Sequence, residues 1–198
     1  MISGNLLWIL LGTLLLGIAS GITGSFSFLQ RQSLIGDAAA HAALPGIALA
    51  FLLTGIKDLP ILMVGAAITS TVAVYCIQLI STHSKLKADA ATGLVLAVFF
   101  GLGIVLLTII NRSPKGNQSG LNDFIFGKAA AMAKADLYWL MICTAIIIIV
   151  CLLFFKEWKL MIFDPIYAKG IGLPVEWMRA CLTFLIVLTI VTGIQAVG

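Results

Sequence analysis

The chain has 198 residues, of which 61% are hydrophobic and 10% are charged, and its formal net charge is +4. Its mean hydropathy of +1.14 is far above that of a soluble domain. This composition excludes a water-soluble globular protein. The basic residues stand in the connections between apolar runs, and no cluster of basic and aromatic residues predicts binding of nucleic acid.

Six apolar runs follow one another along the chain, each close to the roughly 20 residues that a helix needs to cross the hydrocarbon core. Lipid offers no partner to an unpaired backbone group, so these runs are predicted to be helices. We therefore predict an all-α, polytopic membrane protein with a single transmembrane domain over residues 1–198. The runs are Leu6–Phe28, Ala38–Thr54, Pro60–Ile80, Ala91–Ile110, Leu137–Phe155 and Cys181–Gly198.

The first run has no basic residue before it and no clean cleavage site, so a retained helix is favoured over a signal peptide. Gly17 and Gly21 within it form a Gly-x-x-x-Gly pattern, which is typical of close helix packing.

An ionisable pair opens the second run. Asp37 is the one acid that begins an apolar run, and His41 follows four residues later, which places both on one helix face. Such a pair inside a membrane segment is a functional-site hypothesis by default. An imidazole and a carboxylate suit zinc, manganese or iron(II). Two ligands are too few for a tight site, but two copies of the chain facing each other would supply four.

A structural explanation of the same two residues stays open at this point. Asp37 would cap a helix that begins at Ala38, because aspartate accepts hydrogen bonds from free amides at a helix start. His41 would then donate a hydrogen bond to a neighbouring helix. His83, in a polar segment beside Lys85, is interpreted as a solvated surface residue.

Two further segments are too short or too charged to span the membrane. Leu121–Ala135 mixes aromatic, small and charged residues, so it is predicted to be either an interfacial or re-entrant helix or an ordinary amphipathic surface helix. Asp164 before Pro165 predicts a helix start, and a glycine stop predicts a short helix from Pro165 to about Gly170 outside the bilayer. A short helix in that place is suited to docking on a partner.

Orientation is weakly encoded by the basic residues. An outside N-terminus gives seven of them in the cytoplasm against five outside, which follows the positive-inside rule by a small margin. The cytoplasmic set would be Arg31, Lys85, Lys87, Lys156, Lys159, Lys169 and Arg179.

The last run ends at Gly198 without anchoring residues, so we expect the sequence to be truncated at its C-terminus.

The chain lacks Gly-x-Ser-x-Gly, His-Glu-x-x-His and a Gly-Lys-Ser/Thr phosphate loop. We therefore expect neither an enzyme nor an ATP-binding chain.

Four stretches of the sequence resemble one known family. Ser33–Ala50, which contains the Asp37–His41 pair, resembles the signature of the metal-ion ABC transporter permeases, the membrane subunits of bacterial zinc, manganese and iron uptake systems. The segment with Asp164, Pro165, Ala168 and Gly172 resembles a second signature of that family. Thr192–Gly198 resembles the start of a third, and Leu121–Gly127 resembles the segment before the fifth helix.

The resemblance implies the type-II ABC importer permease fold, with about six spans, a short pore helix at Leu121–Ala135 and a cytoplasmic coupling helix at Asp164–Leu173. It implies a multi-pass protein of the bacterial cell membrane with an outside N-terminus, and family members continue for several helices beyond the Gln-Ala-Val-Gly stretch. Asp37 and His41 would line the ion path. The residues implied in ATPase coupling are Asp164, Pro165, Ala168, Lys169 and Gly172.

The implied partners are a cytoplasmic ATP-binding subunit, an extracytoplasmic metal-binding protein, a second permease copy and membrane lipid. No permanently bound cofactor is implied, and the divalent metal ion is the transported substrate. ATP hydrolysis would take place in the separate subunit.

Three alternatives were weighed against this function. A siderophore or cobalamin permease has no need of the Asp37–His41 pair, because its substrate is already chelated. An intramembrane metalloenzyme needs a third ligand and a general base, and His83 and Asp89 stand at the wrong level. A secondary transporter driven by ions would show inverted repeats, and the sequence shows no convincing internal repeat.

Overall fold

The structure is a computed structural model that describes residues 4–30, 34–55, 58–112 and 134–197. The described residues form helices joined by short connections and contain no strand, which confirms the predicted all-α fold. The helices are α1 (Gly4–Leu29), α2 (Ile35–Thr54), α3 (Leu59–His83), α4 (Ala88–Arg112), α6 (Lys134–Leu153), α7 (Phe155–Phe163), α8 (Pro165–Gly170) and α9 (Val175–Val197). The predicted segment Leu121–Ala135 lies outside the described residues, except for Lys134 and Ala135 at the start of α6.

Each of the six predicted apolar runs falls on a long helix. Within the described residues, α1, α2, α3, α4 and α9 are long and apolar enough to cross a membrane. The pair α6 and α7 passes the same test together but bends by 62° at Phe154, which gives up to six spans. The chain is thus a multi-pass membrane protein. The apolar runs did not predict α7, which begins at the end of the fifth run and contains Lys156, Glu157 and Lys159.

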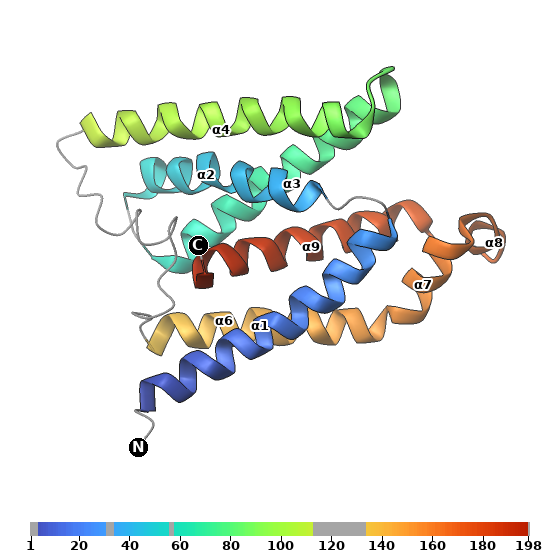
Figure 1. Cartoon of the computed structure of the whole chain (residues 1–198), viewed down its shortest axis with the longest axis horizontal. Helices are drawn as coiled ribbons and strands as arrows, with labels where there is room; N and C mark the ends of the chain where they lie inside the picture. Colours follow the sequence, from blue (N-terminus) through green and yellow to red (C-terminus); the bar gives the residue numbers. More distant parts are fainter. Residues whose placement is uncertain (1–3, 31–33, 56–57, 113–133, 198) are drawn as a thin grey trace.

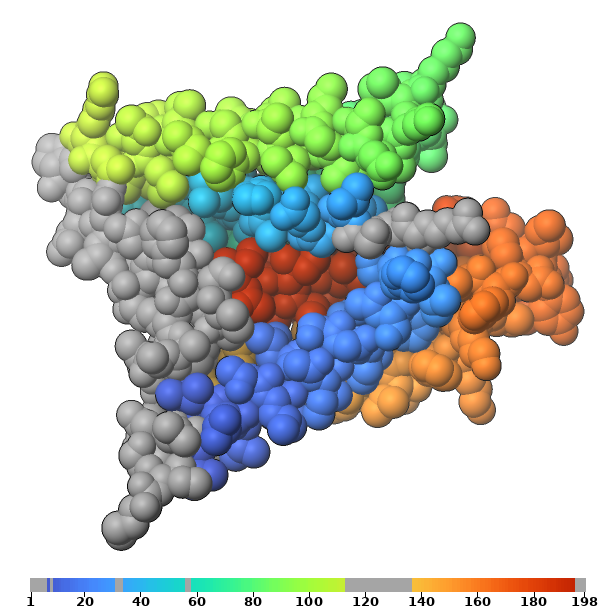
Figure 2. Space-filling view, viewed as in Figure 1, coloured from blue at the N-terminus to red at the C-terminus, as the bar shows by residue number. Residues whose placement is uncertain are grey.

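The helices form two groups on either side of α9 (Figure 1). On one side α2 packs against α3 and α4, and on the other α1 packs against α6, while α9 contacts α1, α2, α3 and α6. Figure 2 shows α9 in red between α2 in cyan and α1 in blue. α7 and α8 lie together at one end of the bundle, where α1 ends and α9 begins.

The closest helix crossing joins α2 to α3 at two glycines. A Cβ atom at Gly46 would overlap the carbonyl oxygen of Gly65 and the hydroxyl of Thr69, and a Cβ at Gly65 would overlap the carbonyl of Gly46. The two backbones therefore touch where neither helix carries a side chain. Small residues allow such contact, and in lipid close packing replaces the hydrophobic effect as the force that joins helices.

Two hydroxyl groups of α3 extend this crossing toward the start of α2. The Thr69 hydroxyl donates to the carbonyl of Ala42, and the Ser70 hydroxyl donates to the carbonyl of Ala39, each at 2.7 Å. Ser70 is fully buried, and interhelical hydrogen bonds of this kind hold membrane helices in register. On the far side of α2, Leu44 occupies the space left by Gly103 of α4.

Trp158 anchors α7 to the end of the bundle. Its side chain is 1% exposed, and its indole N–H donates to the carbonyl of Met178 on α9 at 3.2 Å. The ring also stands edge-on to Phe26 of α1, with 5.7 Å between centroids. A buried Trp needs a partner for its N–H, and here that need fixes α7 to α9.

The glycine crossing predicts a large difference between two identical substitutions. Gly46→Ala adds a Cβ that forces α2 and α3 apart, so we expect the purified protein to lose about 1–3 kcal/mol of stability, the usual effect of overpacking. Gly93→Ala on α4 is the matched control, because nothing lies within 4 Å of the Cβ it adds and alanine is the better helix former. Thermal unfolding in detergent measures both. Equal midpoints for the two variants would contradict the close crossing.

Candidate metal site

Asp37 stands in the first turn of α2 and not at its cap. The helix begins at Ile35, its N-cap position is Leu34, and no side chain caps it. The alternative in which Asp37 caps a helix starting at Ala38 is therefore wrong. A carboxylate in the first turn is still favoured by the helix dipole, which makes a helix start electropositive.

The two predicted ligands face each other at a separation suited to one ion. Oδ1 of Asp37 lies 3.5 Å from Nε2 of His41, which is long for a direct hydrogen bond. Two ligands that each lie about 2.1 Å from a tetrahedral ion stand roughly 3.4 Å apart. The pair is thus spaced to share an ion without a change in the helix.

Contacts with neighbouring helices place this pair at middle depth in the bundle. The His41 ring stands edge-on to Phe100, with 5.2 Å between centroids, and Phe100 is at the centre of α4. Ala39, between the two ligands, bonds to Ser70 near the centre of α3. Figure 1 agrees, because α2 begins well short of the ends of α3 and α4. An ionisable pair at that depth is costly unless it has a function or a partner.

The face that carries the pair is open in the single chain. The side chains of Asp37 and His41 are 66% and 43% exposed. The opposite face of α2 is buried and consists largely of alanine, which brings the helix close to its neighbours. The buried alanines away from the pair are Ala38, Ala39, Ala42 and Ala43.

The part of the chain that the structure describes contains no group of three or more His, Cys, Asp or Glu side chains that could hold a metal. His83 is exposed at the end of α3, beside Thr82, as predicted for a solvated residue. An apolar groove of about 480 Å³ between α3, α6 and α9 is lined by one cysteine, Cys143, and by no His, Asp or Glu. Among the described residues, the Asp37–His41 pair is thus the candidate metal site.

The second set of predicted site residues forms α8. The Asp164 carboxylate accepts a hydrogen bond from the backbone N–H of Tyr167 at 2.9 Å, and Pro165 is the first helical residue. This confirms the helix start read from the sequence. α8 runs to Gly170, and its closing glycine is Gly172, which has φ of 84°.

The helix end follows a pattern that requires that glycine. The N–H of Leu173 donates to the carbonyl of Ala168, and the N–H of Gly172 donates to the carbonyl of Lys169, each at 3.1 Å. These two bonds with a left-handed residue between them form a Schellman motif, in which glycine is strongly preferred.

Ala168 has a different place from the one we expected of a docking residue. It is fully buried in a cluster with Trp158 of α7 and Val175 of α9, so it packs α8 onto its own chain. The outward side chains of α8 are Ile166, which is 85% exposed, and Tyr167. The predicted site residues included neither, although two large apolar residues between Asp164 and Lys169 were a visible signal.

Lys169 also faces outward. Its ammonium lies 3.4 Å from Oε1 of Glu176 on α9, and Oε2 of the same carboxylate lies 3.8 Å from Arg179. These exposed pairs contribute little to stability.

Comparisons with known proteins identify relatives that match nearly the whole chain. The chain is 51% identical over 194 residues to the manganese transport system membrane protein MntC of Bacillus subtilis (strain 168), which covers 98% of this chain and 45% of that protein. It is 45% identical over 190 residues to the zinc transport system membrane protein TroC of Treponema pallidum (strain Nichols), covering 96% and 64%. The chain thus spans about half to two thirds of the length of these relatives.

The fold has a solved counterpart in PsaBC from Streptococcus pneumoniae in complex with Fab. The TM-score is 0.81 at 34% identity, and the match covers 98% of this chain and 67% of that one. A family model, described as the ABC 3 transport family, matches residues 3–198. Since that match takes in nearly the whole sequence, the chain belongs to the ABC 3 transport family.

Proposed function

We propose that this chain forms the membrane-spanning permease part of an ATP-driven importer of divalent metal ions, with manganese as the first candidate and zinc as the second. The observation that carries the proposal is the Asp37–His41 pair, spaced for one ion at middle depth in the bundle. The named relatives support the substrate class, since they are membrane proteins of manganese and zinc transport systems.

The site suits an ion in transit. Asp37 supplies a charged oxygen and His41 a neutral ring nitrogen, a combination that manganese, zinc and iron(II) all accept. The exposed side of the pair leaves room for water or for the same two residues of a second copy. A site with few ligands from each chain holds the ion weakly, and a conduction path needs an ion that can leave.

The second part of the proposed mechanism is energy coupling. We assign α8 to contact with a cytoplasmic ATP-binding subunit. Ile166 and Tyr167 project from it, while Ala168 is locked into the chain. The same end of the bundle carries most of the described lysine and arginine residues, which favours a cytoplasmic position. They are Lys85, Lys87, Lys156, Lys159, Lys169 and Arg179.

The other parts of the proposed assembly are an extracytoplasmic protein that delivers the metal and a second permease copy. A siderophore or cobalamin substrate is less favoured, because a chelated metal does not require a ligand pair at middle depth. An intramembrane metalloenzyme would need a third ligand, and the described residues supply none near Asp37.

The first prediction separates Asp37 as a ligand from Asp37 as a structural residue. Asp37→Asn keeps the size and hydrogen-bonding capacity of the side chain but removes the charge that attracts the ion. We expect uptake of radiolabelled manganese by the complete transporter to fall by roughly tenfold or more, the change that about 1.4 kcal/mol of lost binding produces. Expression and thermal stability should stay unchanged.

Each ligand has a matched control in this chain. Asp58→Asn changes an exposed aspartate at the start of α3, where its side chain makes no capping bond. His41→Gln should behave like Asp37→Asn, and its control is His83→Gln at the exposed end of α3. Uptake by the Asp37→Asn and His41→Gln transporters equal to that of their controls would refute the ion site.

A second prediction concerns α8. Ile166→Glu places a charge on the exposed docking side chain, so we expect ATP hydrolysis to become uncoupled from metal uptake while the permease stays folded. Ala168→Trp should instead lower the thermal unfolding midpoint, because the ring has no space in the buried cluster. ATPase activity, metal uptake and thermal unfolding, measured on both variants, distinguish a role of Ile166 in contact with the ATP-binding subunit from a role of Ala168 in packing within the chain.

Crosslinking supplies the direct test of the α8 contact. A cysteine in place of Lys169 should crosslink to the ATP-binding subunit in the intact complex. A cysteine in place of Arg112 should not form this crosslink, because Arg112 ends α4 at the end of the bundle away from α8. Failure of the first crosslink, or formation of both, would count against the assignment of α8.

A further inference from the structure

α7 begins where the exposed apolar surface of α6 ends. The exposed aromatic residues of this span stand at its two ends, with Tyr138 and Trp139 near the start and Phe154 and Phe155 after the end. Sixteen residues separate Tyr138 from Phe154, which at 1.5 Å per residue is about 24 Å. That length is close to the thickness of the hydrocarbon core, and aromatic rings gather at both of its boundaries.

The surface between those rings is apolar up to the last turn of α6. Its exposed side chains are Ile142, Ile146, Ile149, Leu152 and Leu153. The first charged residue after them is Lys156, on the other side of the 62° bend. α7 is therefore at the level of the lipid headgroups, on the side of the bundle that carries α8.

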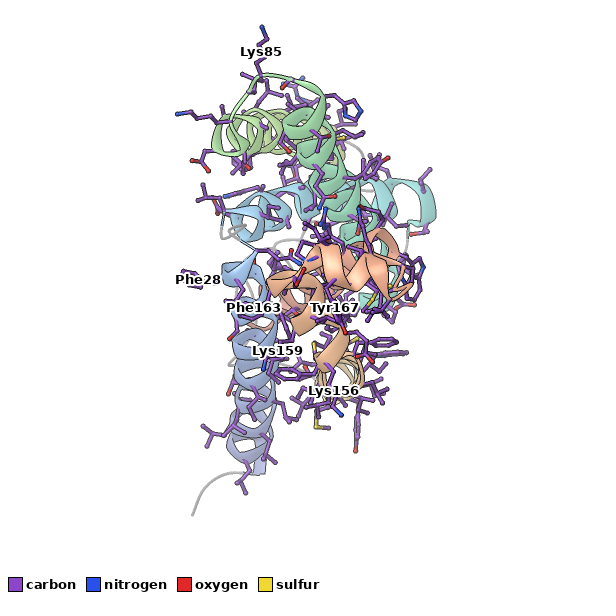
Figure 3. The ribbon with its side chains drawn as sticks, turned by 90° about the vertical axis from the view of Figure 1, so that its right-hand side faces the viewer. Phe28, Lys85, Lys156, Lys159, Phe163 and Tyr167 are labelled. Atoms are coloured by element: carbon purple, nitrogen blue, oxygen red, sulfur yellow. The ribbon has the colours of Figure 1, made fainter. Side chains whose placement is uncertain are left out.

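The two faces of α7 differ sharply. Trp158 and Met161 are buried against the bundle, whereas Lys156, Lys159 and Phe163 are exposed. These three follow the spacing i, i+3 and i+7, which puts them on one side of the helix. In Figure 3, which looks at this end of the bundle, Lys156, Lys159 and Phe163 follow one another along α7. The exposed side thus has two ammonium groups with an aromatic ring at its far end.

No described carboxylate lies within 4 Å of either lysine ammonium. The ion pairs found among the described residues involve Lys169, Arg179 and His41. Glu157, which lies next to Lys156 in sequence, has its Oε2 atom buried and turned away from solvent. Two cations without a described carboxylate partner therefore stand at the edge of an exposed apolar surface.

We propose that Lys156 and Lys159 bind the phosphate of an anionic phospholipid in the leaflet on the α8 side, with Phe155 and Phe163 beside its acyl chains. Lipid is the occupant that the geometry favours, because this surface continues the exposed apolar side of α6, whose aromatic rings are spaced for a hydrocarbon core. Amphipathic helices with lysine beside aromatic residues bind in this way at the interface. Each lysine near an anionic surface strengthens binding roughly fivefold. A bound lipid here would hold α7, and with it α8, at a fixed level in the membrane.

The test compares binding of fluorescent phosphatidylglycerol and fluorescent phosphatidylcholine to the purified permease in neutral detergent. We expect the permease to prefer phosphatidylglycerol by roughly 25-fold, about fivefold for each lysine, and the double variant Lys156→Gln with Lys159→Gln to lose that preference. The variant with arginine at both positions should retain it. Both lysines are exposed, so thermal unfolding should be the same in all variants.

The matched control is Lys85→Gln with Lys87→Gln. These lysines are exposed at the same end of the bundle, in the connection between α3 and α4, and their loss changes the net charge equally. In Figure 3, Lys85 projects at the top of the picture, away from Lys156 and Lys159. Equal loss of preference in both double variants would show general charge attraction and overturn the site. Equal binding of the two lipids by the parent would also overturn the site. So would a Lys156→Gln, Lys159→Gln variant that loses the ATP-binding subunit from the complex while its lipid binding is unchanged.

Discussion

The contact between the backbones of α2 and α3 at Gly46 and Gly65 decides where the candidate site lies. Apolar side chains gain little by leaving lipid for protein, so helices in a membrane associate through close packing and hydrogen bonds. Here two glycines let the helices touch, and the Ser70 hydroxyl fixes the start of α2 beside the middle of α3. Because α2 is held at that level, its first two turns place Asp37 and His41 at middle depth along the bundle, on an open face.

This placement is expensive for a single chain in lipid. A charged carboxylate and an imidazole with open faces at middle depth would lose much of their hydration. A second copy or a water-lined path would restore it, and an ion between the two ligands would also neutralise the carboxylate. The same feature that makes the isolated chain unfavourable in lipid is the one that the proposed ion site requires.

The length and hydropathy of the apolar runs were enough to predict the spans, and the Asp164-Pro165 pair was enough to predict the start of α8. The start of α2 was not predictable, because packing against α3 and α9 extends that helix past the aspartate that local rules would place at its cap. The orientation of Ala168 was not predictable either, because the packing of neighbouring helices decides which side of a six-residue helix is buried. The helix α7 was missed because its lysines interrupt the hydropathy, although Trp158 and Met161 at a spacing of three residues mark a buried helix face.

Among the described helices, α9 connects the two parts of the proposed mechanism. At its start, Val175 and Met178 pack in the cluster that contains Ala168 of α8. Farther along, Val187 and Val191 pack in the cluster that contains Ile35 at the start of α2. A helix of 23 residues transmits a displacement along its axis, because each turn is held by its own backbone hydrogen bonds. A shift of α8 by a bound partner would therefore reach the turn that carries Asp37 through side-chain packing, provided that α9 has two stable positions against α2.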